Sequence, residues 1–130
     1  MKPINIMLVD DSDVDLFLHQ TFLNKCKWVN AIIPFNSGTS ALAYLGECSL
    51  KNWPDLILLD IQMPIINGFE FLSKFNYFEE EYLNKCKVVM VSSTLDFGDI
   101  SRARANSIAL ELLAKPLNTN LLFEIIKDKF

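Results

Sequence analysis

The chain has 130 residues and a formal net charge of −4 at pH 7, with 51% hydrophobic and 22% charged residues. This length suits a single globular domain with a core of its own, and the charge gives no reason to expect nucleic-acid binding through a general basic surface. Cys26, Cys48 and Cys86 are too widely spaced for a zinc site or a disulfide framework, and indicate a reducing compartment. With no signal peptide and no membrane-length apolar run, the expected location is the cytoplasm.

The first strand is predicted over residues 4–9, and it ends at an acidic pair, Asp10 and Asp11. A helix follows, in which Ser12 with Asp15 three residues later resembles an N-terminal capping box. That capping role accounts for Ser12 and Asp15 but leaves the acidic pair unexplained. The apolar residues of this helix recur at spacings of three and four: Val14, Phe17, Leu18 and Phe22.

Residues 28–35 predict a second strand, and Pro34 within it favours an edge position because proline cannot donate a ladder hydrogen bond. A short helix is expected from Asn36 onward. Gly46 is expected to end this helix, since glycine commonly follows the last helical residue.

The third strand carries an unbroken aliphatic run over residues 56–59 that stops at Asp60. Such a run is typical of a strand buried on both faces of a parallel sheet. Open α/β sheets place their sites at the carboxyl ends of strands. Asp60 is therefore either a cap for the following turn or part of a site at that edge.

From Gly68 to Tyr82 the chain is expected to be helical, with most of its aromatic side chains in the core. Residues 87–91 predict a fourth strand ending at Ser92. A fourth helix is expected over residues 96–106.

A fifth strand is predicted over residues 108–114, ending at Lys115. A last helix follows, capped by Asn118. Five strands thus alternate with five helices, which predicts an α/β fold with a doubly wound parallel sheet. The flavodoxin-like strand order 2-1-3-4-5 would set strand one beside strand three.

In that order the carboxylates of Asp10, Asp11 and Asp60 would crowd together. Two unit charges ~4 Å apart repel by roughly 4 kcal/mol at an effective dielectric of ~20. A hard divalent cation bound through oxygen ligands would offset this repulsion, and Mg²⁺ is the expected ion.

With a cation present, the Asp60 carboxylate would be able to attack a phosphoryl group and form an acyl phosphate. Lys115 would then pair with phosphate oxygens, and the Ser92 hydroxyl would donate a hydrogen bond. Each residue also has an ordinary alternative, because Ser92 fits a strand-end turn and Lys115 a solvated cation.

Four segments together resemble the receiver domain of bacterial two-component response regulators, in particular the single-domain, chemotaxis-regulator-like kind. They are V-D-D-S at 9–12, L-D-I-Q-M-P-I-I-N-G-F-E at 59–70, V-S-S at 91–93 and A-K-P-L at 114–117. The resemblance covers residues 1–130. It implies a flavodoxin-like fold and a phosphorelay switch that is not a dedicated enzyme. A partner histidine kinase or histidine phosphotransfer domain would phosphorylate it.

Position by position, the resemblance implies that Asp10 and Asp11 bind Mg²⁺ and that Asp60 is the phosphoacceptor. Gln62 would lend its backbone carbonyl to the metal. Ser92 matches the switch hydroxyl, and Lys115 the phosphate-pairing lysine, whose bond to the following proline is often cis in the family.

One departure is that Leu112 occupies a position where relatives often have Tyr or Phe, so aromatic gating is expected to be weak or absent. Phosphorylation is expected to change the surface formed by the fourth helix, fifth strand and fifth helix, residues 96–127, for an unknown downstream protein. No DNA-binding or catalytic domain is expected within residues 1–130, which fits either a stand-alone receiver acting by protein contact or a segment of a longer protein.

Two other readings remain open at this stage. The first is a receiver-fold binding module that works without phosphorylation, although the intact set of functional residues argues against it. The second is an unrelated protein of the same fold, such as a flavodoxin or a small phosphatase. The acidic loop 10–13 would repel a flavin phosphate, and Gln62 replaces the second acid of many aspartate-based phosphatases.

Overall fold

The computed structural model describes all residues, 1–130, and its centre is one parallel sheet. The five strands lie in the order β2-β1-β3-β4-β5, with every neighbouring pair parallel. The fold class and strand order expected from the sequence are therefore confirmed, and β2 is an edge strand. The strands are β1 (Ile4–Val9), β2 (Val29–Phe35), β3 (Leu56–Asp60), β4 (Lys87–Ser92) and β5 (Ala109–Ala114).

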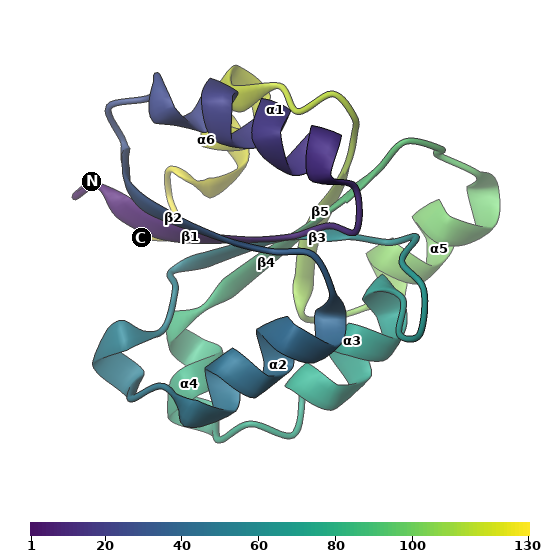
Figure 1. Cartoon of the computed structure of the whole chain (residues 1–130), viewed down its shortest axis with the longest axis horizontal. Helices are drawn as coiled ribbons and strands as arrows, with labels where there is room; N and C mark the ends of the chain where they lie inside the picture. Colours follow the sequence, from purple (N-terminus) through teal and green to yellow (C-terminus); the bar gives the residue numbers. More distant parts are fainter.

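Six α-helices cover the two faces of the sheet. Figure 1 shows α1 and α6 on one face, and α2, α3, α4 and α5 on the other. No helix has the length and apolar character that crossing a bilayer requires. The helices are α1 (Asp13–Asn24), α2 (Gly38–Glu47), α3 (Gly68–Phe75), α4 (Glu80–Lys85), α5 (Phe97–Ala105) and α6 (Thr119–Ile126), with a short 3₁₀ helix η1 (Leu50–Asn52) before β3.

The aliphatic run of β3 divides between two hydrophobic cores. Leu56 and Leu58 pack under α1 and α6, whereas Ile57 and Leu59 pack under the helices of the opposite face. Alternate side chains of a strand point to opposite faces, so in a strand covered on both sides every side chain is buried and apolar residues are favoured at each position. The run therefore ends where β3 emerges from between the helix layers, at Asp60.

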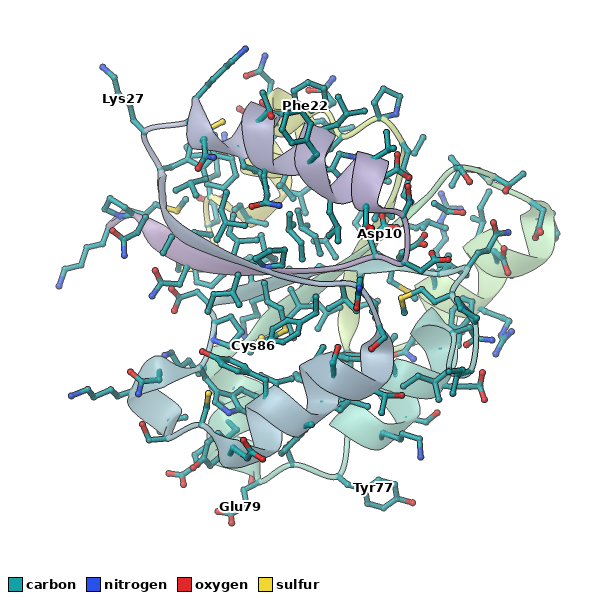
Figure 2. The ribbon with its side chains drawn as sticks, viewed as in Figure 1. Asp10, Phe22, Lys27, Tyr77, Glu79 and Cys86 are labelled. Carbon is teal, nitrogen blue, oxygen red and sulfur yellow. The ribbon has the colours of Figure 1, made fainter.

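The aromatic segment after Gly68 forms two helices and not one, which corrects the sequence expectation of five helices in all. Helix α3 ends at Phe75, and Phe78 turns back so that its ring centroid lies 4.9 Å from that of Trp53. This edge-on aromatic contact is made by the turn that separates α3 from α4. Tyr77, in the connecting turn, is 91% exposed and points away from the body of the protein (Figure 2).

Gly46 does not end α2, contrary to the expectation. The helix continues through Glu47, and Cys48 ends it by turning to extended backbone with φ −83° and ψ 142°. A glycine stop depends on the left-handed conformation, and no glycine in the chain has a positive φ.

Helix α1 is present as expected, but its recurring apolar residues do not fill the core. Val14 and Phe17 are each 68% exposed, and Leu18 is also exposed. The buried positions of α1 are instead Leu16, His19 and Leu23. The spacing of three and four marked a helix, but the side of α1 that faces the sheet was decided by packing.

Candidate functional site

The carboxyl ends of the parallel strands bring the predicted polar residues to one edge of the sheet. Asp10 directly follows β1, Asp60 is the last residue of β3 and Lys115 directly follows β5. Figure 2 labels Asp10 at this edge. The carboxylates of Asp10, Asp11 and Asp60 each offer an oxygen, and these oxygens all lie within 4.8 Å of one another.

The ammonium of Lys115 lies among three carboxylates. Its Nζ is 2.7 Å from Asp10 Oδ2, 2.9 Å from Asp15 Oδ2 and 3.4 Å from Asp60 Oδ1. Burial by itself would lower the pKa of Lys115, but the neighbouring carboxylates of Asp10, Asp15 and Asp60 together raise it above its usual value. Lys115 is therefore a permanent positive charge at the site.

Asp60 lies at the bottom of the site with only 3% of its surface exposed. Burial, reinforced by the neighbouring charge of Asp10, raises the pKa of Asp60 to about 7, although Lys115 opposes the shift. The charged form of Asp60 is thus short of positive partners. A carboxylate with a strongly perturbed pKa in a cluster of charges is a feature typical of functional sites.

The arrangement fits a hard divalent cation. Asp10 Oδ2 is buried and makes no hydrogen bond of good geometry, despite its closeness to Lys115. The backbone carbonyl of Gln62 accepts no hydrogen bond from the chain. Oxygen atoms are the ligands that Mg²⁺ prefers, so the carboxylates of Asp10, Asp11 and Asp60 supply a suitable donor set.

Ser92, the last residue of β4, is fully buried, and its hydroxyl is engaged within its own loop. Ser92 Oγ donates to the Thr94 carbonyl at 2.7 Å and accepts from the Thr94 amide at 3.2 Å. Thr94 also donates from Oγ1 to Gln62 Oε1 at 3.3 Å. The loops after β3 and β4 are therefore linked by a side-chain contact.

Gly68 sets how closely α3 approaches the acid. A Cβ at this position would lie 2.6 Å from the Asp60 carbonyl oxygen and 2.9 Å from Ile61 Cα. The Gly68 amide instead donates to the Ile61 carbonyl at 2.8 Å. The glycine eight residues after Asp60 is thus explained by close backbone contact, which only a residue without a side chain permits.

Two residues near the site were not predicted as functional. The carboxylate of Asp15 bonds Lys115, whereas the sequence had assigned it to a helix cap. His19 is buried and accepts through Nε2 from the Leu117 amide at 3.4 Å, and burial lowers its pKa. No local pattern indicates either role, because both depend on how α1 sits against the loop after β5.

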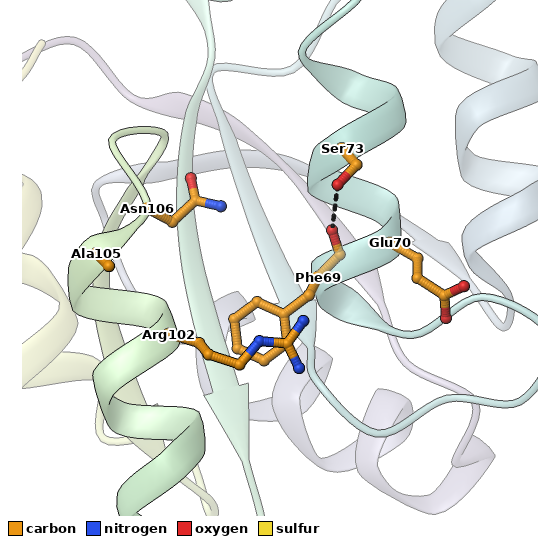
Figure 3. A pocket seen from close by; sticks show the side chains of 6 residues that line it. All are labelled: Phe69, Glu70, Ser73, Arg102, Ala105 and Asn106. Atoms are coloured by element: carbon orange, nitrogen blue, oxygen red, sulfur yellow. Dashed lines mark hydrogen bonds between the residues drawn. The ribbon is translucent and has the colours of Figure 1, made fainter.

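A pocket opens beside the site, between α3 and α5. Figure 3 shows Arg102 of α5 lying over the ring of Phe69 of α3, with its Cζ 4.0 Å from the ring centroid. Such a cation–π contact contributes about 0.5–1 kcal/mol at an exposed position. It is one of the few attachments of α5 to the body of the protein, since Ala103 is the only buried residue of that helix.

The fold and this edge of the sheet define a known class of protein. Residues 6–127 match the response regulator receiver domain family. The chain belongs to this family, as the sequence motifs indicated. The Lys115–Pro116 bond is cis, as the resemblance implied.

Solved structures agree closely with this assignment. A response regulator receiver protein from Dyadobacter fermentans DSM 18053 is 38% identical, with a TM-score of 0.89 and 97% of each chain covered. A two-component response regulator from Cytophaga hutchinsonii is 32% identical, with a TM-score of 0.91, over 99% of this chain and 98% of that one.

Curated relatives include much longer proteins. A protein-glutamate methylesterase/protein-glutamine glutaminase of Trichodesmium erythraeum is 29% identical over 119 residues, which are 91% of this chain and 32% of the relative. The chain spans a third or less of the first curated relatives it matches.

Proposed function

We propose that this protein is a phosphoacceptor switch in which Asp60 receives a phosphoryl group from a partner histidine kinase or histidine phosphotransfer domain. The observation that carries the proposal is the buried Asp60 carboxylate, set between an acidic pair and the permanent charge of Lys115. The protein is a phosphoacceptor that assists its own phosphorylation and dephosphorylation, and it is not a dedicated enzyme. It acts in the cytoplasm.

Asp10, Asp11, Asp60 and the Gln62 carbonyl would hold Mg²⁺. When bound, Mg²⁺ supplies positive charge that offsets the carboxylates and the oxygens of an incoming phosphoryl group. Asp10 Oδ2, which lacks a hydrogen bond of good geometry, supports this assignment.

In the transfer step an Asp60 carboxylate oxygen forms a bond to phosphorus as the bond from phosphorus to the donor breaks. The donor imidazole carries a proton on its other ring nitrogen, so it leaves with the bonding electron pair as a neutral ring, and no proton has to come from Asp60. Lys115, 3.4 Å from Asp60 Oδ1, is close enough to pair with an oxygen of the transferred group. The product is an acyl phosphate.

The phosphodonor protein docks over the exposed apolar residues of α1. Val14 and Phe17 lie on the outer side of a helix whose first turn also carries Asp15, a direct partner of Lys115. An exposed apolar group of this kind beside a reactive carboxylate suits a protein donor, because docking there excludes water from the site.

Phosphorylation is read out through α5, β5 and α6, residues 96–127. A phosphoryl group brings roughly −1.5 to −2 charges and three acceptor oxygens. Ser92 is the nearest hydroxyl from β4, and it has to leave its bonds with Thr94 to reach them. The loop after β4 leads directly into α5, so the movement is passed to that weakly attached helix.

The runner-up function is a receiver-fold binding module that works without phosphorylation. One experiment separates the two. Incubation with acetyl phosphate and Mg²⁺, followed by intact-mass measurement, is expected to add one phosphoryl group to the wild type and none to Asp60→Asn. A wild type that stays unlabelled favours the binding module, and a labelled Asp60→Asn variant places the acceptor elsewhere.

A further inference from the structure

Asp15 is the one carboxylate around Lys115 that the proposed transfer chemistry leaves without a role. It lies in the first turn of α1, with its side chain 31% exposed and its Oδ2 2.9 Å from Lys115 Nζ. This contact is shorter than the one between Lys115 and Asp60, at 3.4 Å.

The contact is not a by-product of helix capping. In a capping box the side chain of the third helical residue accepts from the backbone amide of the cap. Here the Ser12 amide donates instead to Asp10 Oδ1 at 2.9 Å, while Ser12 Oγ still accepts from the Asp15 amide at 3.2 Å. Asp10 has thus replaced Asp15 as the acceptor for the cap, and the Asp15 carboxylate is left to bond the ammonium.

The contact also uses one of the hydrogen-bonding protons of Lys115. An ammonium has three N–H donors, and the two shortest contacts of Nζ are to Asp10 and Asp15. One donor is left on the Asp60 side, so a phosphoryl group that pairs with Lys115 through more than one oxygen would need the donor held by Asp15. Asp15 therefore competes with that group for Lys115, and its own negative charge repels phosphate oxygens.

We propose that Asp15 is a positioning residue that holds the Lys115 ammonium on the α1 side of the site in the resting protein and so slows phosphoryl capture by Asp60. The inference rests on the proposed function, because it assumes that Asp60 accepts the group. The reaction itself is unchanged by it. With acetyl phosphate, the new oxygen–phosphorus bond at Asp60 forms as the phosphorus–oxygen bond to acetate breaks, and acetate leaves with the electron pair.

The test compares Asp15→Asn with Asp13→Asn in the full chain. Both acids lie in the first turn of α1 and each variant removes one negative charge, but only Asp15 contacts Lys115. Asp15→Asn is expected to raise the initial rate of labelling by acetyl phosphate and Mg²⁺ about two- to five-fold, the effect typical of a partly exposed ion pair. Asp13→Asn is expected to stay near the wild-type rate, and Asp15→Glu, which keeps the carboxylate, is also expected to stay near it.

The salt dependence of the labelling rate separates the effect of the direct Asp15–Lys115 contact from the long-range repulsion between Asp15 and the phosphodonor. Labelling is measured in 0.1 M and in ~1 M salt, where the Debye length falls from ~10 Å to ~3 Å. A gain that comes from releasing Lys115 is expected to persist at high salt, whereas a gain from general repulsion is expected to vanish. Thermal unfolding of each variant checks that the fold is intact.

The outcomes distinguish this inference from the function on which it rests. Equal rates for Asp15→Asn and the wild type, equal gains in the two Asn variants, or a rate of Asp15→Glu matching Asp15→Asn would each overturn the role of Asp15 while leaving Asp60 as acceptor. No labelling of the wild type at any donor concentration overturns the proposed function, and the inference with it.

Discussion

Lys115 Nζ lies 3.4 Å from Asp60 Oδ1, although Asp60 ends β3 and Lys115 follows β5, with β4 between these two strands. The lysine contacts two other acids more closely than it contacts Asp60. Without a bound cation, the negative charge of Asp60 is therefore only partly balanced, and the ionised carboxylate destabilises the folded state.

We expect Asp60→Asn to stabilise the metal-free protein at high pH. The pKa of Asp60 is raised to about 7 from an ordinary value of 3.8, so the unfolded state ionises first and stability falls as pH rises from 4 to 7. Asn carries no such cost. The variant is expected to gain up to a few kcal/mol above pH 7 and nothing near pH 4. Urea unfolding in EDTA between pH 4 and pH 8 measures this, and a gain independent of pH would contradict it.

Asp11→Ala is expected to weaken Mg²⁺ binding at least about ten-fold, because it removes one of the few carboxylates available to the ion. Calorimetric titration of the metal measures the affinity. Asp13→Ala, at a nearby exposed acid outside the cluster, is the matched control. Equal affinities for Asp11→Ala and the wild type would exclude this metal site.

Ser92→Ala is expected to keep phosphorylation while losing much of the response of α5. The hydroxyl is the group that would transmit the change at Asp60 to the loop before α5, whereas the bond-forming oxygen belongs to Asp60. Hydrogen exchange with and without beryllofluoride measures the protection of residues 96–106. The control is Ser93→Ala, at the exposed neighbour. A wild-type response in Ser92→Ala means that the signal takes another route.

Leu112 bears on how large the conformational change on phosphorylation is. It is partly buried against the core of the α2–α5 face and has no polar tip. We therefore expect the change in α5 to be shallow, with protection confined to the loops around Asp60, Ser92 and Lys115 and to α5 itself.

Phe17→Asp is expected to slow phosphoryl transfer from a phosphotransfer domain at least about ten-fold, since it puts a charge into the proposed docking surface. Labelling by acetyl phosphate is expected to stay unchanged, because this small donor needs no docking. Tyr77→Asp, at another exposed aromatic position away from α1, is the control. Equal slowing with both donors would show damage to the site and contradict docking on α1.

Ile65→Asn is expected to stabilise the protein by about 0.5–1 kcal/mol. Ile65 has a φ of 70°, a left-handed conformation that is costly for a β-branched side chain and tolerated by Asn. Its side chain is 88% exposed, so little burial is lost. Urea midpoints measure the gain. Val14→Asn, at an exposed β-branched residue with helical backbone, is expected to give none, and a destabilised Ile65→Asn would contradict the argument.

The sequence by itself determined the five strands and the edge on which the polar residues meet. Asp60 ends an aliphatic run, and a run buried on both faces has to stop where the strand leaves the helix layers. Lys115 follows a mostly apolar strand, although Glu111 interrupts β5 and the strand is only partly buried. The sequence shows where each strand ends. Because all strands are parallel, their carboxyl ends share one edge, and the family motifs indicate the role of the residues there.

Only the tertiary structure decided which atoms meet at that edge. The spacing of Val14, Phe17 and Leu18 marked a helix, but the rotation of α1 depends on the fit of Leu16 and Leu23 against the sheet. That rotation turns the apolar residues outward and the Asp15 carboxylate onto Lys115, 100 residues further along the chain. Local patterns carry no information about such a contact, because its energy comes from partners that only packing brings together.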